Sequence, residues 1–152
     1  MGRNKKFPPL LIILAIILVI WLLSRFLFIP ESKRVDLVIK TGKKAVENEN
    51  LPKVMSLVYD DYQDDFGMNY QQLEKWFINH FRSYNDIKVL IPYKKISVKE
   101  NVAVCSLRVS IGARDLTTNE YEIIYGYSAW GDELILNLTK INNRWLFSGA
   151  QP

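Results

Sequence analysis

Four carboxylates within six residues form the densest group of side chains in this sequence that could do chemistry: Asp60, Asp61, Asp64 and Asp65. Carboxylate oxygens are the ligands that hard cations such as Ca²⁺ prefer, so Asp61, Asp64 and Asp65 are candidate metal ligands. Their spacing differs from that of an EF-hand loop, whose ligands alternate along the chain. A solvated loop whose like charges face water fits the same pattern. The sequence therefore indicates an acidic loop, with a cation site as the alternative interpretation.

His80 is the only histidine of the chain. An imidazole can act as a general acid or base near neutral pH. Helical spacing places His80 on or beside an apolar stripe that contains Trp76 and Phe81, so a hydrogen-bonded, partly buried helix residue is the alternative interpretation. One histidine cannot build the usual multi-histidine metal site. The sequence holds no phosphate-binding glycine loop, no Cys/His cluster and no Ser/His/Asp set, and we expect no cofactor.

Aromatic residues near the C-terminal end could bind a ligand or a partner. Tyr121, Tyr125 and Tyr127 alternate with Ile123, which predicts that they share one face of a strand. That face would line a ligand cavity or form an exposed sheet surface for self-association. Trp130 could be an exposed loop anchor for a partner. Packing into the core is the alternative for each of these side chains.

The elements that position these residues follow a long apolar segment, Leu10–Ile29, in which only Ser24 and Arg25 are polar. A helix of this length spans about 30 Å, which is the thickness of the hydrocarbon core of a bilayer. We predict a transmembrane helix over this segment, preceded by a short basic tail, residues 1–9, with Trp21 and Arg25 near the level of the headgroups. No small-residue cleavage site follows, which favours an uncleaved anchor over a signal peptide.

The orientation of this anchor depends on its flanking charges. Arg3, Lys5 and Lys6 precede it and favour a cytoplasmic N-terminus. The more numerous basic residues after it would favour the opposite orientation. Because a short basic tail before a first apolar segment is usually retained, we predict a single-pass membrane protein whose C-terminal domain is periplasmic or otherwise extracytoplasmic.

The chain after the anchor has the size of one domain. Of the 20 basic residues, four lie in residues 1–30, which contain no acid, so 16 basic residues face 16 acidic ones in the remainder. A nucleic-acid-binding domain usually carries a basic excess, so we expect no nucleic-acid partner. The single cysteine, Cys105, excludes an intrachain disulfide and is interpreted as a small buried hydrophobic residue.

Helical periodicity occupies the first half of this domain. Apolar residues recur at helical spacing over residues 35–46, 51–58 and 70–84. Asn69 is a candidate N-cap for the last of these helices, with Gln72 three residues later as in a capping box. Residues 30–34 would be the linker between the anchor and the first helix.

Period-two alternation replaces the helical pattern after residue 86 and predicts four to six strands. Glu100–Asn101 and Asn142–Asn143 are predicted turns, and Gly126 and Gly131 indicate a bulge or a sharp bend. Helices followed by mostly antiparallel strands predict an α+β fold in which the helices cover one face of the sheet.

Four stretches together suggest a family: AVENENLPKVMSLVYDDY, NYQQLEKWF, KISVKENVAVCSLRVSI and ELILNLTKINNRWLFSGAQ, the last with Trp145 shortly after its hairpin turn. In order and texture, residues 35–152 resemble the nuclear-transport-factor-2-like superfamily, also called SnoaL-like or cystatin-like. The resemblance implies about three helices on a curved sheet, with a conical cavity between them. Members include isomerases, dehydratases, polyketide cyclases and non-enzymatic binding or dimerisation modules.

The resemblance implies that Asp60, Asp61 or His80 would act as a general acid or base if the domain were an enzyme. Since the sequence shows no convincing set of reacting groups, we predict a membrane-tethered, non-catalytic module. It would bind a protein partner or a small apolar ligand and would form a homodimer through its sheet. The alternatives are an isomerase or dehydratase using a cavity acid, and a scaffold subunit of an envelope or secretion complex, whose periplasmic assembly component has a similar layout.

Overall fold

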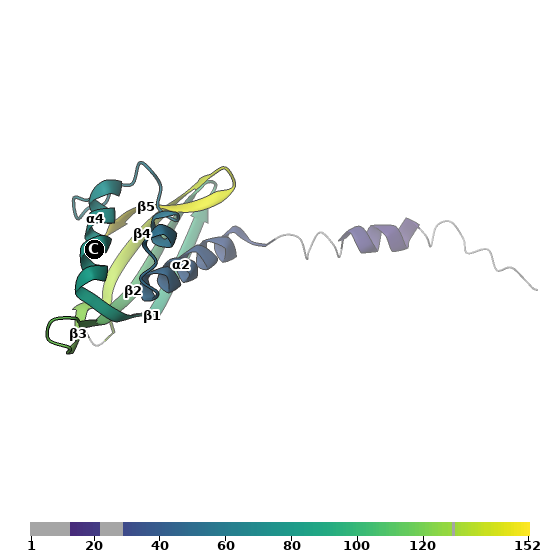
Figure 1. Cartoon of the computed structure of the whole chain (residues 1–152). Helices are drawn as coiled ribbons and strands as arrows, with labels where there is room; N and C mark the ends of the chain where they lie inside the picture. Colours follow the sequence, from purple (N-terminus) through teal and green to yellow (C-terminus); the bar gives the residue numbers. More distant parts are fainter. Residues whose placement is uncertain (1–12, 22–28, 129) are drawn as a thin grey trace, which may run out of the picture. The chain divides into compact units, whose positions relative to one another are not determined.

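The computed structural model describes residues 13–21, 29–128 and 130–152 (Figure 1). The chain divides into two compact units, Met1–Pro30 and Glu31–Pro152. In the first unit, residues 13–21 are helical and their side chains are exposed. Within the described residues, no helix combines the length and the apolar character that a membrane crossing needs. Leu10, Arg25 and most of the flanking parts of the predicted anchor lie outside the described residues, whereas Trp21 and Ile29 are described and exposed.

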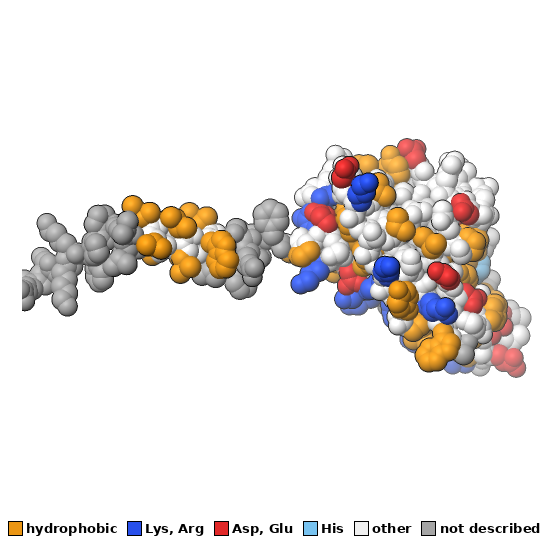
Figure 2. Space-filling model, turned by 180° about the vertical axis from the view of Figure 1, so that it is seen from behind, with side chains coloured by type: hydrophobic (Ala, Val, Ile, Leu, Met, Phe, Trp, Pro, Cys, Tyr) orange, Lys and Arg blue, Asp and Glu red, His pale blue; other side chains and the backbone are white. Residues whose placement is uncertain are grey.

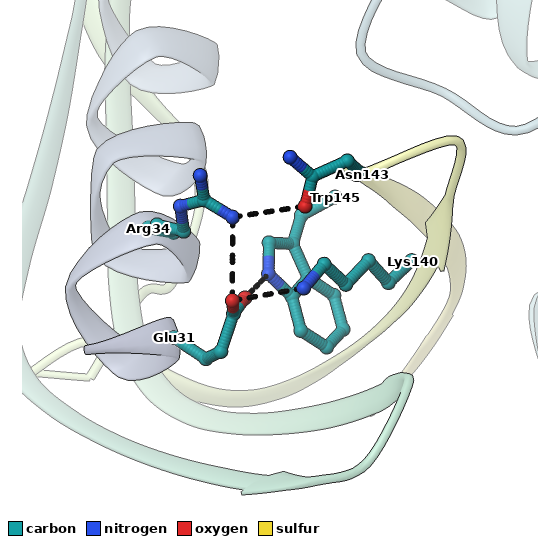
Figure 3. A network of polar contacts seen from close by, with 5 residues as sticks. All are labelled: Glu31, Arg34, Lys140, Asn143 and Trp145. Atoms are coloured by element: carbon teal, nitrogen blue, oxygen red, sulfur yellow. Dashed lines mark hydrogen bonds and ion pairs between the residues drawn. The ribbon is translucent and has the colours of Figure 1, made fainter. Parts of the chain in front are cut away.

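The second unit begins with helix α2, Glu31–Glu47, which starts earlier than the predicted residue 35 and takes up most of the predicted linker. Side-chain contacts explain the early start (Figure 3). Glu31 accepts hydrogen bonds from Lys140 Nζ at 2.8 Å and Trp145 Nε1 at 2.7 Å, and lies 3.3 Å from Arg34 Nη1. Arg34 also donates to Asn143 Oδ1 at 3.0 Å. We call these five residues the Glu31 clamp.

Two further helices follow, α3 from Leu51 to Met55 and α4 from Tyr70 to Ser83. The capping box predicted for α4 is confirmed: Asn69 accepts from the Gln72 amide at 3.0 Å, and Gln72 accepts from the Asn69 amide at 2.9 Å. Helix α3 ends earlier than its apolar spacing predicts. The reason is that the Leu57 carbonyl accepts a hydrogen bond from the Phe147 amide, which pulls the chain toward the sheet.

The sheet has five antiparallel strands: β1 (Tyr84–Lys99), β2 (Val102–Asp115), β3 (Tyr121–Tyr125), β4 (Asp132–Ile141) and β5 (Arg144–Gln151). The order is β1-β2-β4-β5, and β3 pairs with β2. Strands β3 and β4 pair with consecutive parts of β2, residues 111–114 and residues 102–109. The architecture is therefore the predicted α+β type, and in Figure 1 α2 lies in front of the sheet while α4 lies to its left.

The connection from β3 to β4 turns sharply at two glycines, as predicted. Gly126 and Gly131 have φ angles of +73° and +76°, and a Cβ atom on either would collide with the backbone of Val109 in β2. Glycine is the residue that tolerates both conditions. Between them, Tyr127 and Trp130 are exposed to 76% and 72%.

The core lies between the helices and the inner face of the sheet. Val35 and Ile39 of α2 are buried against sheet residues that include Leu107 and Leu138. Cys105 belongs to this core, is fully buried as predicted, and burial raises the pKa of its thiol to about 11. The opposite face of the sheet exposes a few apolar residues, and Figure 2 shows hydrophobic side chains scattered there among charged ones.

Candidate functional site

A cavity of about 490 Å³ lies between the helices and the inner face of the sheet. Helices α2, α3 and α4 and all five strands contribute to its walls. Most lining side chains are aliphatic or aromatic, among them Ile39, Val46, Val54, Leu57, Leu73, Phe77, Phe81, Val89, Leu107, Ile124, Leu136 and Phe147. Small-molecule sites have volumes of about 300–1,000 Å³ and are mostly apolar, so both size and lining suit a ligand.

Phe66 and Trp76 mark the mouth of the cavity, since both line it although they are 48% and 38% exposed. A turn holds Phe66 there: the Asp64 amide donates to the Met68 carbonyl at 3.1 Å, and Gly67 has a φ of +84°. The sequence shows this feature only as Phe66, Gly67 and Met68 within the acidic stretch, and sequence analysis did not assign it to a ligand site.

The backbone of the acidic stretch docks on the sheet, while three of its four carboxylates face solvent, as the loop interpretation predicts. The amides of Tyr59, Gln63 and Asp65 donate to carbonyls of β5, at 2.9, 3.2 and 3.0 Å, so the segment covers the edge of that strand. Backbone donors and acceptors on an open edge would otherwise remain unpaired, which explains why the segment docks there. This docking of the backbone positions the four carboxylates of the segment.

Only one of the four carboxylates reaches the cavity. Asp64 lines it, whereas Asp60, Asp61 and Asp65 are exposed and do not. Among the described residues, no group of three acidic, histidine or cysteine side chains lies close enough to hold a metal ion. The predicted set of Asp61, Asp64 and Asp65 is therefore not brought together, because Asp64 turns inward and the other two turn to solvent.

Asp64 has protein partners on both carboxylate oxygens. The Tyr62 hydroxyl donates to Oδ2 at 2.8 Å, and the Met68 amide donates to Oδ1 at 2.7 Å. Tyr62 is 5% exposed, and burial together with the Asp64 carboxylate raises the pKa of its phenol. The phenol therefore stays protonated and committed to Asp64. Sequence analysis missed this pair, whose only signal is its i, i+2 spacing.

His80 lines the cavity from α4. Its Nδ1 atom lies 2.8 Å from the Trp76 carbonyl, and its ring stacks on the Trp76 ring with centroids 3.8 Å apart and planes at 29°. A carbonyl only accepts, so Nδ1 carries the hydrogen, and in the neutral ring Nε2 is an acceptor. Both interpretations of His80 given by the sequence, a hydrogen-bonded helix residue and a cavity residue, describe its position.

The prediction that Tyr121, Tyr125 and Tyr127 share one face of a strand is wrong. Ile111 pairs with Tyr125 but Gly112 pairs with Ile123, so β3 has one extra residue opposite β2. This bulge separates the tyrosines: Tyr125 lines the cavity, Tyr121 is exposed on the other face, and Tyr127 lies beyond the end of β3. A bulge reverses the alternation on which the prediction depended.

Trp130, the predicted loop anchor, is exposed and does not line the cavity. It therefore remains a candidate for contact with a partner. Lys43 and Tyr125 complete the polar lining of the cavity: Lys43 Nζ lies 3.4 Å from Glu47, and the Tyr125 hydroxyl donates weakly to the Glu133 carbonyl at 3.4 Å. The cavity can thus enclose an apolar molecule and offers few polar contacts to it.

No protein-family model and no curated protein matches the sequence. Solved structures do match the fold. A nuclear transport factor 2-like superfamily protein from Salmonella enterica superposes with a TM-score of 0.66 at 12% identity, over 79% of this chain and 87% of that chain. A ketosteroid isomerase-like protein from Erwinia carotovora gives a TM-score of 0.63 at 13% identity, over 82% and 95%.

A protein of unknown function with a cystatin-like fold from Nostoc punctiforme gives a TM-score of 0.57 at 11% identity, over 78% of this chain and 86% of that chain. These sequence identities are too low to transfer an activity to this chain. The three structures nevertheless agree on the architecture. The chain has a nuclear-transport-factor-2-like, cystatin-like α+β fold, as the resemblance in its sequence implies.

Proposed function

We propose that this nuclear-transport-factor-2-like domain is a non-catalytic module that holds a small apolar ligand in its cavity and is tethered to a membrane by residues 10–29. The observation that supports the proposal is the cavity of about 490 Å³ with its predominantly apolar walls. Transfer of apolar surface from water into such walls is favourable by about 25 cal/mol per Å². A ligand of this kind also partitions into bilayers, so a tethered domain would meet it at the membrane surface.

Displacement of a neutral solvatochromic dye, Nile red, from the full-length chain tests ligand binding. Leu136 lines the cavity, whereas its neighbour Ile135 on β4 does not. We expect Leu136→Trp to weaken dye binding at least tenfold because the indole occupies ligand space, and Ile135→Trp to leave it unchanged. Equal effects of the two variants would mean that the dye binds elsewhere.

Membrane fractionation tests the tether. The full-length chain should stay with membranes through an alkaline carbonate wash, whereas a chain that starts at Glu31 should be released. A reporter enzyme that is active only outside the cytoplasm, fused after Pro152, tests the orientation, and we expect activity. Release of the full-length chain by carbonate would refute the anchor without affecting the ligand proposal.

An isomerase or dehydratase is the second candidate function. The observation that favours it is that His80 and the Tyr62–Asp64 pair line one cavity. The formation of a conjugated enone from a β,γ-unsaturated ketone can be followed by absorbance. Turnover that His80→Gln or Asp64→Asn abolishes with the fold intact would favour the enzyme. Binding of the ketone without turnover would favour the binding module.

Self-association is a further part of the proposal. The face of the sheet opposite the cavity exposes Leu90, Tyr93, Val104 and Tyr121, and a second copy of the chain is the occupant that we propose for it. Sedimentation of the full-length chain in mild detergent should give a dimer, and Tyr93→Lys should give a monomer. A wild-type monomer that co-purifies with an envelope protein in fixed stoichiometry would instead favour the scaffold alternative.

A further inference from the structure

Six side chains with nitrogen or oxygen atoms line the cavity: Lys43, Tyr62, Asp64, Trp76, His80 and Tyr125. The two charged ones already have partners. The Lys43 ammonium lies 3.4 Å from the Glu47 carboxylate. Both oxygens of Asp64 accept hydrogen bonds from the protein. A charged ligand group would lose its hydration and find no free counter-charge in the cavity, so the lining selects an uncharged ligand.

The stacked pair of Trp76 and His80 provides the remaining polar atoms. The hydroxyls of Tyr62 and Tyr125 donate to Asp64 and to the Glu133 carbonyl. In contrast, no hydrogen bond from the described residues reaches His80 Nε2 or the indole N–H of Trp76. In the neutral imidazole His80 Nε2 is an acceptor, whereas the indole N–H of Trp76 is a donor.

A hydroxyl group complements this pair because it both donates and accepts a hydrogen bond. We propose that the cavity selects uncharged apolar alcohols or phenols, whose hydroxyl donates to His80 Nε2. The inference rests on the proposed function, since it assigns the ligand class of the same cavity. The Nδ1 contact to the Trp76 carbonyl fixes the tautomer and keeps Nε2 as an acceptor. Because His80 lines the cavity, we assign it as the specificity-determining residue of this inference.

Three probes of one shape test the inference: 2-naphthol, its methyl ether 2-methoxynaphthalene, and naphthalene. Only 2-naphthol can donate a hydrogen bond, whereas the ether can still accept one. Each probe is titrated by calorimetry into the full-length chain in lipid nanodiscs, with empty nanodiscs as the reference for partition into lipid. We expect 2-naphthol to bind about tenfold more tightly than either other probe, as one net hydrogen bond to a neutral partner provides.

Two variants test whether the preference for 2-naphthol depends on His80. His80→Leu should bind all three probes with similar affinity, because it removes the acceptor and keeps an apolar wall. His80→Gln should restore part of the preference, because its amide oxygen can replace Nε2 as the acceptor. Far-UV circular dichroism and thermal unfolding of each variant show whether the fold is intact, and the ratio between probes does not depend on a uniform loss of stability.

The outcomes separate this inference from the proposed function. Equal wild-type affinity for the three probes would overturn the hydroxyl selection and leave apolar binding in place. A preference that survives in His80→Leu would also overturn it, because the hydroxyl would then be bound by another group such as Asp64. Absence of binding for every probe, together with unchanged dye binding in Leu136→Trp, would overturn the proposed function itself.

Discussion

The Glu31 clamp and the cavity differ in how their polar atoms are satisfied. In the clamp, Glu31 accepts hydrogen bonds from Lys140 and Trp145 and pairs with Arg34, which in turn donates to Asn143 (Figure 3). In the cavity, His80 Nε2 has no partner among the described residues. A fully paired network fixes the backbone on both sides of it. The cavity therefore leaves one acceptor, His80 Nε2, available to water or to a bound ligand.

The two tryptophans of these regions give the largest expected difference in stability. Trp145 is 3% exposed and packs in the main core, whereas Trp76 is 38% exposed at the mouth of the cavity. We expect Trp145→Ala to lower the free energy of unfolding by about 3–5 kcal/mol, the usual cost of deleting a buried aromatic ring. Trp76→Ala should cost about 1 kcal/mol or less. Urea unfolding followed by far-UV circular dichroism measures both, and similar costs would remove the contrast between the regions.

Ligand affinity should distinguish the two exposed tryptophans, Trp76 and Trp130. Trp76→Ala should weaken Nile red binding about tenfold, because the indole forms the cavity mouth and an aromatic contact of this kind contributes about 1 kcal/mol beyond burial. Trp130→Ala is the matched control, since Trp130 is exposed but does not line the cavity. Loss of binding in Trp130→Ala would move the ligand site to the β3–β4 connection.

A smaller effect is expected from Gly42, which lies within α2 and lines the cavity. An added Cβ would lie 3.2 Å from the edge of the Phe147 ring, which also lines the cavity and has free space to move into. Because alanine favours a helix interior by about 1 kcal/mol over glycine, Gly42→Ala should stabilise the domain by about 0.5–1 kcal/mol. It should also weaken dye binding. Thermal unfolding and dye titration measure the two effects, and destabilisation would mean that the Phe147 ring cannot move.

Local signals made part of the fold predictable. The capping box of Asn69 and Gln72 depends on residues three apart, so the sequence alone indicated the start of α4. The alternation in β2 likewise predicted that Cys105 is buried. The bulge in β3 escaped prediction because it depends on pairing with β2 around Ile111 and Gly112.

The candidate site was harder to predict than the fold. His80 was recognised because it is the only histidine, but its free acceptor depends on the Trp76 carbonyl one turn away in α4. Asp64 was proposed as a metal ligand and instead accepts a hydrogen bond from Tyr62. Apart from the i, i+2 spacing to Tyr62, the sequence does not distinguish Asp64 from its acidic neighbours. The contact between Glu31 and Trp145 joins the two ends of the domain, and such long-range pairs leave no local pattern in a sequence.

The smallest expected effect is the pH dependence of the Glu31 clamp. The hydrogen bond from Lys140, then that from Trp145, lowers the pKa of Glu31 below its ordinary value of 4.5. A carboxyl whose pKa falls on folding adds stability above its unfolded pKa and loses it as the pH falls through the folded value. We therefore expect Glu31→Gln to lower the melting temperature by a few degrees at pH 6 to 7, and this difference to shrink below about pH 4.5.

The comparison with Glu31→Gln is needed because other carboxyls titrate in the same range. The pKa of Asp36 is lowered by Lys40 and Lys94, and that of Asp115 by the amides of Thr118 and Thr117, so the wild-type curve alone mixes their contributions. Both groups remain in the variant, and their effects cancel in the difference between the two curves. A difference that stays constant from pH 3 to 7 would mean that the clamp acts through packing of Trp145 rather than through the charge of Glu31. The clamp and the cavity would then share a dependence on aromatic packing.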